Sequence, residues 1–365
     1  MSTVAFDELP TLDSASVAST ATFARWRGDL RTLVLGEIGA FLRGAGVEDL
    51  LPVKVDDILW QYAAGGKGLR STFLYLGWLC GAEPAAAAVR AAASLELLHG
   101  FALLQDDVMD NAVLRRGAPA AHVVLTTRHG ARADSRFGTA AATLLGDMCL
   151  VWAEQMMRES GLDTAALERM WPRYDAMRIE LAAGQFADLS NDVRACPPLS
   201  AVLDTARAKS GNYTVRRPLE LGAALAGCEP RTLHVLGAYG SRVGEAFQLR
   251  DDLLGIFGSE ALTGKPQDCD LGEHKATSVV VVALDCAGPA ARRELSELLA
   301  RPVLDVPAIE RCRTLIAECG APQRIEAMID ARVEVALNLL DTGPLDAVRR
   351  AALRQLALLC TAGPA

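Results

Sequence analysis

The segment from Leu103 to Pro119, LLQDDVMDNAVLRRGAP, carries three aspartates near the end of a predicted helix, followed by adjacent arginines and a Gly-Ala-Pro stop. Asp106 and Asp110 are four residues apart, so their Cβ atoms would lie about 5–6 Å apart on one helix face. Carboxylates this close raise one another's pKa, and the apolar flanks add a cost of burial, so the cluster needs a compensating cation. Oxygen donors suit Mg²⁺, which keeps coordination positions for water and phosphate. The segment therefore predicts a magnesium site formed by Asp106, Asp107 and Asp110, with a solvated acidic helix face as the alternative.

A second acidic pair lies in FQLRDDLLGIFG, residues 247–258, again within an apolar predicted helix. Asp251 and Asp252 are adjacent, but the position four residues after Asp251 is Gly255, so this pair offers fewer ligands than the first. Its leading carboxylates can still bind a metal ion. Because sites in helical bundles are built from side chains on facing helices, we expect the two acidic helices to face each other.

Basic residues in two places are candidates for binding an anion. Arg115 and Arg116 follow the first aspartates within about two helical turns, and adjacent side chains diverge, so each could bind a different anion. Arginine presents a planar fork of donors and lysine a point charge, and both suit phosphate. In GGKGLR, residues 65–70, the glycines would let the backbone approach an anion that Lys67 and Arg70 bind. The motif lacks the spacing of a P-loop and follows no predicted strand, so it does not predict that type of ATP binding.

A single histidine, His99, lies in an apolar predicted helix seven residues before Asp106 and on nearly the same face. A lone histidine in such a helix is more often a satisfied core residue than a functional one. Its position two turns before the carboxylates leaves both roles open.

The composition indicates an all-α protein with one large core. Hydrophobic residues make up 51% of the 365 residues and aromatic residues 5%, which favours tightly packed helices over sheets. Residues 1–20 are small and polar and predict a loose tail, and residues 21–365 predict a single helical bundle. Period-two alternation is nearly absent, and only the run from Ser278 to Ala283 is ambiguous between helix and strand.

Charge and cysteine content limit the classes of partner and compartment. The net charge of −8 argues against a general nucleic-acid binder, which would show a basic face. The nine scattered cysteines lack a CxxC motif, so they predict neither a disulfide framework nor a zinc site and fit a reducing cytoplasm. The N-terminus lacks the features of a signal peptide. The longest apolar runs, such as the alanine-rich one before His99, are too short or carry Arg90 or Glu96, so we expect no transmembrane segment.

The motifs, in their order and spacing, resemble those of the isoprenyl diphosphate synthases, the trans-prenyltransferases that build prenyl diphosphates. The resemblance covers most of residues 60–280 and implies an all-α fold with a deep central cavity, normally as a homodimer. It also implies Mg²⁺-dependent condensation of isopentenyl diphosphate with an allylic diphosphate, in which positive charge stabilises the departing pyrophosphate. The segments that carry it are GGKGLR (65–70), ELLHGFALLQDDVMDNAVLRRGAPAAH (96–122), FGTAAATLLGDMCL (137–150), GQFADL (184–189), KSGNYT (209–214), FQLRDDLLG (247–255) and GKPQDCDLGEHKAT (264–277).

The resemblance assigns roles to individual residues. A cluster of three Mg²⁺ ions would be held by the two acidic motifs, Asp106, Asp107, Asp110, Asp251 and Asp252. The allylic diphosphate on these ions would also contact Arg115, Lys209, Gln248 and Lys275. Isopentenyl diphosphate would bind without metal to Lys67, Arg70, His99 and Arg116.

Some positions depart from the usual pattern of the family. These are Gly68 in place of a common arginine, Ser71 in place of the following proline, Gly255 in place of the last aspartate of the second motif, and Asp268 and His274 in place of glycine. The DDxxG form occurs in active bacterial members, so Gly255 does not by itself argue for an inactive protein.

Product length would depend on what blocks the cavity below the first aspartates. In family terms the floor residue is Phe101, five positions before the motif, a pattern that resembles geranylgeranyl (C20) diphosphate synthases, with C15 and C25 as the next products. Helix geometry places Ala102 nearer the Asp106 face, so only the family nominates Phe101, which could equally be a core aromatic. Two other classes are a class I terpene cyclase, whose second metal motif the segment at Asn191 lacks, and a non-catalytic synthase subunit, which typically loses the acidic motifs.

Overall fold

The computed structural model describes residues 9–51, 53–129, 134–192, 197–258 and 269–363. In these ranges the regular structure is helical apart from one two-stranded hairpin, which confirms the predicted all-α class. The chain divides into two compact units. The first comprises Met1–Pro172, Pro218–Leu233 and Leu345–Gln355, and the second comprises Arg173–Arg217, His234–Pro344 and Leu356–Ala365. The single domain expected for residues 21–365 stays a prediction.

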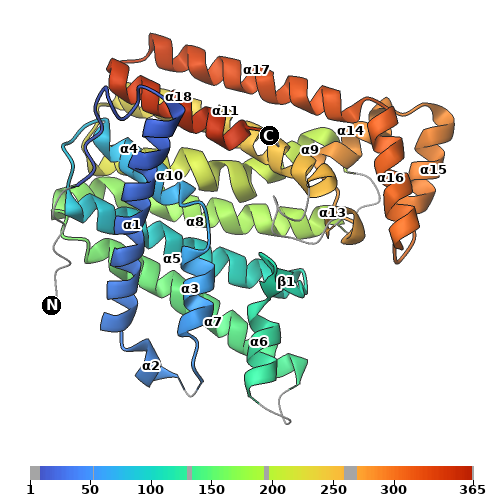
Figure 1. Ribbon diagram of the computed structural model, residues 1–365, viewed down its shortest axis with the longest axis horizontal. Helices are drawn as coiled ribbons and strands as arrows, with labels where there is room; N and C mark the ends of the chain where they lie inside the picture. The colour runs from blue at the N-terminus through green and yellow to red at the C-terminus, as the bar shows by residue number, and fades with distance from the viewer. Residues whose placement is uncertain (1–8, 52, 130–133, 193–196, 259–268, 364–365) are drawn as a thin grey trace. The chain divides into compact units, whose positions relative to one another are not determined.

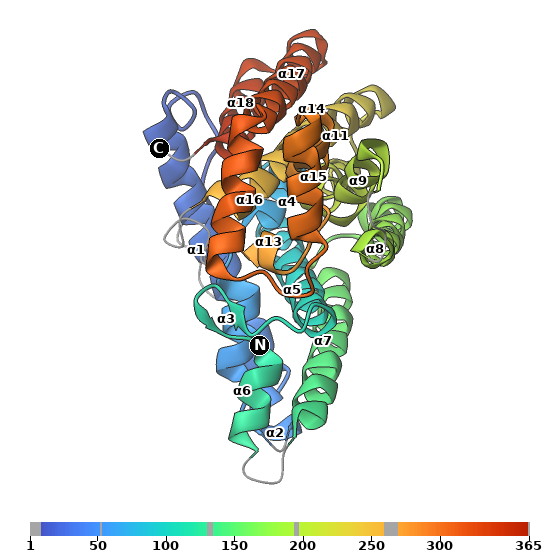
Figure 2. The same cartoon turned by 90° about the vertical axis from the view of Figure 1, so that its right-hand side faces the viewer.

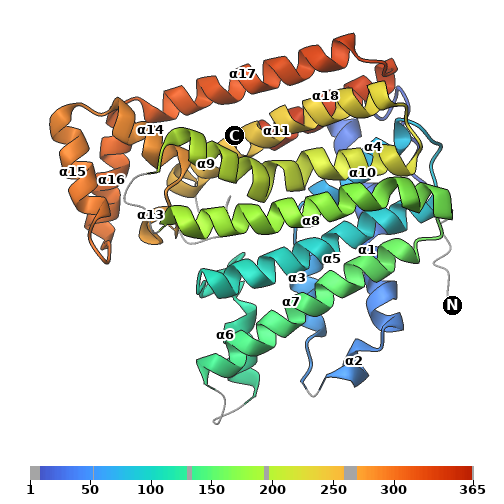
Figure 3. The same ribbon diagram turned by 180° about the vertical axis from the view of Figure 1, so that it is seen from behind.

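The first unit is organised around one long helix, α5. This helix packs against α7, α4, α1 and α3, and Figures 1 and 3 show α5 and α7 running side by side. The elements of the unit are α1 (Thr20–Gly44), α2 (Val47–Leu50), α3 (Asp56–Ala64), α4 (Leu69–Leu79), α5 (Ala86–Met109), β1 (Leu114–Arg115), β2 (Ala118–Pro119), α6 (Ala121–Arg128), α7 (Ser135–Arg158), the first part of α8 (Thr164–Asp192), most of α10 (Arg217–Leu225) and much of α18 (Ala347–Thr361).

Helix α5 is central because it is apolar around most of its circumference, as a helix surrounded by neighbours must be. Ala88, Ala92 and Leu98 are fully buried. By length and composition this 24-residue helix, which carries Arg90 and Glu96, is apolar enough to cross a membrane. However, 67% of its most apolar window is buried inside the protein, which is also what the core helix of a globular protein shows.

The last turn of α5 places the aspartates of the first motif. Asp110 is the C-cap residue, and Asn111 follows it with a φ of 50°. The N–H of Asn111 donates to the carbonyl of Val108 at 3.3 Å, and the N–H of Ala112 donates to the carbonyl of Asp107 at 2.9 Å. This pair of bonds is a Schellman ending, and asparagine tolerates the left-handed conformation that it requires.

A tight hairpin carries the two adjacent arginines. Strand β1 pairs antiparallel with β2, and Arg116 and Gly117 form the turn between them with φ values of 53° and 75°. Positive φ at both turn positions is the type I′ geometry that joins short hairpins. The predicted Gly-Ala-Pro stop is therefore a hairpin. Arg115 lies in its first strand, and Arg116 lies in its turn.

The second unit has a core centred on α14. This helix packs against α9, α15, α16 and α17, and Figure 2 shows α15 and α16 side by side. The elements of the unit are the last part of α8, α9 (Leu199–Ala206), the π-helix η1 (Arg207–Arg216), most of α11 (Pro230–Phe257), α13 (Cys269–Gly272), α14 (Ser278–Cys286), α15 (Pro289–Leu299), α16 (Val306–Glu318), α17 (Ala321–Thr342) and the end of α18.

The ambiguous run from Ser278 to Ala283 is helical and forms most of α14. Thr277 caps the helix, because its side chain accepts a hydrogen bond from the N–H of Val280. The β-branched valines at 279–282 favour a strand locally, but none is more than 6% exposed. Packing against neighbouring helices therefore outweighs local propensity in this segment.

Candidate active site

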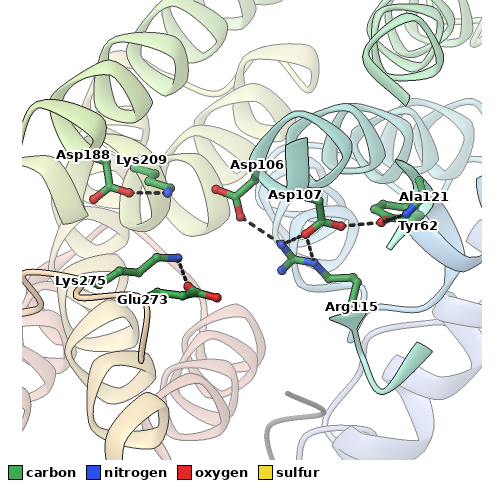
Figure 4. A network of polar contacts seen from close by, with 9 residues as sticks. All are labelled: Tyr62, Asp106, Asp107, Arg115, Ala121, Asp188, Lys209, Glu273 and Lys275. Carbon is green, nitrogen blue, oxygen red and sulfur yellow. Dashed lines mark hydrogen bonds and ion pairs between the residues drawn. The ribbon is translucent and has the colours of Figure 1, made fainter. Parts of the chain in front are cut away.

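The first aspartate motif contains a buried ion pair. Nε of Arg115 donates to Oδ1 of Asp107 at 2.7 Å, and its Nη2 donates to Oδ2 of Asp106 at 3.1 Å. The other oxygen of Asp107 accepts from the hydroxyl of Tyr62, which itself accepts from the N–H of Ala121 at 3.0 Å. Figure 4 shows this network, in which the side chain of Asp107 is 1% exposed. Both carboxylate oxygens of Asp107 are therefore engaged within the protein.

The two partners of Asp107 have shifted pKa values. Burial alone would lower the pKa of Arg115, but the hydrogen bond and the charge of Asp107 outweigh burial and raise it. Burial raises the pKa of Tyr62, and the negative charge of Asp107 raises it further. Both groups keep their protons at physiological pH, so the Asp107 carboxylate faces a cation and a hydroxyl donor.

Asp106 and Asp110 are the carboxylates of this motif that fit a metal ion. The Asp106 side chain is 19% exposed, and Asp110 is partly buried at the cap of α5. In the described part of the chain no three His, Cys, Asp or Glu side chains converge as a preformed metal cage. Mg²⁺ does not need one, because it binds one or two carboxylates and completes its coordination with water and phosphate. Two carboxylates one helical turn apart therefore fit Mg²⁺ that is bound together with a phosphate ligand.

The GGKG loop between α3 and α4 packs against Arg116 through its first two glycines. Nη1 of Arg116 donates to the carbonyl of Gln61 at 2.9 Å. A Cβ atom at Gly65 would lie 2.3 Å from this Nη1, and one at Gly66 would lie 3.2 Å from Nη2. These glycines therefore make room for a guanidinium group, a function that the sequence did not predict. Lys67, the next residue, is exposed.

His99 lies within reach of several positive charges. Burial lowers the pKa of His99 well below its usual value, and the charges of Arg70, Arg116 and Arg115 lower it further. Burial also lowers the pKa of Arg116, as do Arg115 and Arg70. His99 is therefore neutral at physiological pH, and it lies beside a cationic group in the first unit that comprises Arg70, Arg115 and Arg116. A bound anion would relieve the repulsion within this group.

Glu96 provides a negative charge beside this group. It is 3% exposed, and its Oε1 accepts from the N–H of Ser71 at 3.0 Å and from the Ser71 hydroxyl at 2.7 Å. Its charge also acts to raise the pKa of Arg116. A proline at position 71 has no N–H and could not make the first of these bonds. Ser71, one of the departures from the family pattern, therefore adds a link between α4 and α5.

The second aspartate motif contains one buried carboxylate, Asp252, and one exposed carboxylate, Asp251. Asp252 is 7% exposed, and its Oδ2 accepts from the N–H and the hydroxyl of Ser278 at 3.0 and 2.6 Å. Its Oδ1 accepts from Nε2 of Gln248 at 2.8 Å. Asp252 thereby satisfies an N–H group at the start of α14. Asp251 is exposed, and the side-chain-free Gly255 offers no ligand one turn later.

Lys209 lies in η1, a π-helix of ten residues. Its Nζ pairs with Oδ2 of Asp188 at 2.5 Å, as drawn in Figure 4. Gly184, one turn before Asp188 on α8, allows the two helices to approach, because a Cβ there would lie 2.4 Å from the backbone nitrogen of Lys209. The segment GQFADL therefore positions Lys209. Single π-turns within α-helices are frequent at functional sites, and this longer π-segment holds a predicted site residue.

Lys275 is paired with its own neighbour Glu273 at 2.9 Å, also drawn in Figure 4. Between them His274 has a φ of 57°, in the left-handed region that glycine adopts without strain. This conformation explains why glycine is usual at that position in the family that the sequence resembles. The first residues of the segment, 264–268, which include Asp268, lie outside the described ranges.

The structure divides the predicted site residues between the units. The second holds Lys209, Gln248, Asp251, Asp252 and Lys275. The predicted facing of the two acidic helices concerns both units and stays a prediction.

Phe101 and Ala102 are both partly buried on α5, so burial does not decide which of them is the floor residue. The first unit holds Lys67, Arg70, His99, Phe101, Asp106, Asp107, Asp110, Arg115 and Arg116.

Four residues with clear contacts in the site were not predicted from the sequence: Tyr62, Glu96, Asp188 and Ser278. Their partners lie 45, 25, 21 and 26 residues away along the chain. Glu96 and Asp188 stand within segments that carry the family resemblance, so those segments could have nominated them. Tyr62 and Ser278 stand outside these segments, and only folding brings them to their partners.

Comparison with known proteins gives one consistent family. The model of the polyprenyl synthetase family matches residues 53–316. A geranylfarnesyl diphosphate synthase of Aeropyrum pernix is 32% identical over 286 residues, which are 77% of this chain and 85% of that protein. A (2E,6E)-farnesyl diphosphate synthase of Mycobacterium bovis is 33% identical over 264 residues, 71% of this chain and 68% of that protein.

A solved structure gives the same answer for the fold. The geranylgeranyl pyrophosphate synthase of Corynebacterium glutamicum, complexed with isoprenyl diphosphate and magnesium, superposes with a TM-score of 0.84 at 32% identity. The match covers 91% of this chain and 98% of that one. With its helical architecture, its two aspartate motifs and its cationic group, the chain belongs to the polyprenyl synthetase family of trans-prenyltransferases.

Proposed function

We propose that this protein condenses isopentenyl diphosphate with an allylic diphosphate, in an Mg²⁺-dependent reaction that yields a short-chain all-trans prenyl diphosphate. The observation that most supports this is that the first unit contains two kinds of diphosphate-binding group. It has a group of cationic side chains, and it has two accessible aspartates, Asp106 and Asp110, at the end of α5. Cationic side chains suit a diphosphate without metal, and aspartates suit a diphosphate that carries Mg²⁺. A terpene cyclase binds a single diphosphate and would leave Arg70 and Arg116, beside the neutral His99, without a substrate.

We propose the following roles for the individual residues. Mg²⁺, held by Asp106, Asp110 and Asp251, would neutralise charge on the departing pyrophosphate. Arg115 orients Asp106 and adds positive charge. Lys209 and Lys275, each paired with a carboxylate, would contact the same diphosphate as preorganised donors.

The remaining residues would act on isopentenyl diphosphate. Lys67, Arg70 and Arg116 would bind its phosphates. His99, being neutral, would donate one hydrogen bond from its ring N–H. The double bond of isopentenyl diphosphate then attacks the allylic cation, and a proton leaves to the pyrophosphate. Apolar side chains of α5, such as Phe101, would keep water from the cation.

We propose geranylgeranyl diphosphate, C20, as the product. The relatives bear the names of C15, C20 and C25 synthases, so farnesyl and geranylfarnesyl diphosphates are the neighbouring candidates. The C20 proposal rests on Phe101 as the residue that limits chain length.

Product analysis tests the function directly. The purified protein is incubated with Mg²⁺, isopentenyl diphosphate and farnesyl diphosphate, and the products are separated by chromatography with and without EDTA. We expect a C20 diphosphate that EDTA abolishes. A hydrocarbon product would instead indicate a cyclase, and absence of turnover would indicate a non-catalytic subunit.

The floor residue is tested by a pair of substitutions on α5. Phe101→Ala should lengthen the product beyond C20, because it removes the ring that blocks elongation. Ala102→Phe should leave the C20 product unchanged if Ala102 does not face the growing chain. An unchanged product in the first variant together with a shortened product in the second would move the floor from Phe101 to Ala102.

A further inference from the structure

Two arginines of α1 donate hydrogen bonds to the backbone of the GGKG loop. Nη2 of Arg31 donates to the carbonyl oxygens of Ala64 and Gly66 at 2.8 and 2.9 Å. Nη2 of Arg27, one turn earlier, donates to the carbonyl oxygen of Lys67 at 3.1 Å. These contacts join positions 33 to 40 residues apart in the chain. Helix α1 precedes residues 53–316, the part that the family model matches.

The contacts determine the direction of the amide groups in the loop. In a planar trans peptide the N–H points opposite to the C=O, and the described chain has no cis peptide bond. Since the carbonyls of Gly66 and Lys67 point to the arginines, the N–H groups of Lys67 and Gly68 point away from α1. Successive N–H groups that point the same way attract an anion. Gly68 takes part without strain, because its φ of 62° suits glycine.

The same contacts remove an unfavourable charge from the loop. A backbone carbonyl oxygen carries partial negative charge and would repel a diphosphate that approached it. Arg31 and Arg27 bind two carbonyls of the loop, those of Gly66 and Lys67, and the carbonyl of Ala64 at the end of α3, and they neutralise the partial charge of all three. These contacts therefore leave the N–H groups of Lys67 and Gly68 pointing toward the ligand.

We propose that Arg31, assisted by Arg27, is a positioning residue for the binding of isopentenyl diphosphate. It acts through the loop, by holding the carbonyls so that the Lys67 and Gly68 amides and the Lys67 side chain face the diphosphate. This role rests on the proposed function, because it presupposes that the loop binds this substrate.

The test uses the full-length protein and four variants. Arg31→Met keeps the aliphatic stem and removes the donors, and Arg31→Lys restores a cation with three donors. Arg27→Met removes the weaker contact. Arg25→Met is the matched control, since Arg25 is an exposed residue of the same helix. Steady-state rates give kcat and KM for each substrate, calorimetry gives metal-free binding of isopentenyl diphosphate, and thermal melting monitors the fold.

Arg31→Met should raise KM and the dissociation constant for isopentenyl diphosphate about tenfold, with a smaller rise for Arg27→Met. KM for the allylic substrate and kcat should change less than about twofold, Arg31→Lys should restore much of the affinity, and Arg25→Met should resemble the wild type. Unchanged KM for isopentenyl diphosphate in Arg31→Met would overturn the proposal. Equal losses for both substrates with a lowered melting temperature, not restored by lysine, would show a merely structural role. If the wild type neither turns over nor binds isopentenyl diphosphate, the proposed function itself fails.

Discussion

The second aspartate of each pair, Asp107 or Asp252, is buried, at 1% and 7% exposure, and both of its oxygens accept hydrogen bonds. The first aspartate, Asp106 or Asp251, is more accessible. A buried carboxylate is tolerated because its partners satisfy it, and removing one partner leaves an uncompensated charge. The two residues of each pair therefore have different roles, although adjacent carboxylates look equivalent in the sequence.

This division predicts opposite phenotypes for two neighbouring substitutions. Asp107→Ala leaves the buried Arg115 only its contact with Asp106 and removes the acceptor of the Tyr62 hydroxyl, so it should lower the free energy of unfolding by about 3–5 kcal/mol, measured by denaturant titration. Asp106→Asn should change it by less than about 1 kcal/mol and should raise the Mg²⁺ concentration that half-saturates the reaction. Equal stability of the two variants would contradict a structural role for Asp107.

His99 gives a prediction about stability and pH. Its folded-state pKa is well below the usual value of about 6.5, so the unfolded chain binds a proton that the folded chain does not. The stability contributed by neutral His99 is complete above pH 6.5 and is lost as pH falls below it, at up to about 1.4 kcal/mol per pH unit.

Comparison with a variant isolates this contribution from other titrating groups. Melting temperatures of the wild type and His99→Gln are measured from pH 7.5 to pH 5. The wild type should lose stability more steeply below pH 6.5, since glutamine does not titrate. Parallel curves would mean that His99 is accessible to solvent or already charged in the folded protein.

At the scale of secondary-structure elements, the close approach of α8 and η1 depends on one small residue, Gly184. A Cβ atom at Gly184 would lie 2.4 Å from the Lys209 backbone nitrogen and 2.8 Å from the carbonyl carbon of Ala208. Backbone atoms cannot move aside as the end of a flexible side chain can, so the helices would have to separate. The ion pair of Lys209 with Asp188, one turn further along α8, would then be displaced.

We therefore expect Gly184→Ala to lower both stability and kcat. The loss of stability should be about 1–3 kcal/mol, typical of overpacking in a close contact, and kcat should fall because Lys209 is displaced. Gly28→Ala is the control, because Gly28 lies within α1 and a Cβ there meets nothing within 4 Å. That variant should be neutral or up to about 1 kcal/mol more stable. Full activity of Gly184→Ala would show that η1 tolerates a shift of Lys209.

At the scale of the whole molecule, exposed apolar side chains identify a surface through which chains could associate. On α7, Leu144 and Val151 are 63% and 64% exposed, and on α8, Ile179 and Phe186 are 70% and 74% exposed. Each pair is seven residues apart and so lies on one face of its helix. Large apolar residues in such stripes are typical of surfaces that another protein covers. We propose that a second copy of this chain covers α7, which gives the homodimer that the resemblance implies.

The association is tested by introducing charge on this face. The double variant Leu144→Glu and Val151→Glu should convert a two-chain species into single chains, because burying two carboxylates at an interface is unfavourable. Light scattering coupled to gel filtration measures the mass. A wild type that already has the mass of one chain would contradict the proposed homodimer.

The sequence alone determined the fold class and the residue types of the candidate site. The 3.6-residue apolar periodicity of the helices and the residue types at Asp106, Asp251 and Lys67 are local properties, which need no knowledge of distant contacts. The order of these motifs along the chain resembles that of one family, and the match to the family model confirms that the chain belongs to it. The hairpin at Arg116 and the helical conformation of the run from Ser278 to Ala283 were not determined in this way, because capping and packing decided between local alternatives.

Only the tertiary structure decided which of the similar residues are engaged inside the protein. The sequence cannot distinguish Asp107 from Asp106, because their difference arises from Tyr62, 45 residues away, and from the hairpin that returns Arg115 to α5. It gives no reason to connect Arg31 with the GGKG loop, because the hydrogen bonds go to backbone carbonyls, which every residue has. Burial and hydrogen-bond partners depend on contacts distant in the chain, and these set both the charge state and the orientation of each group.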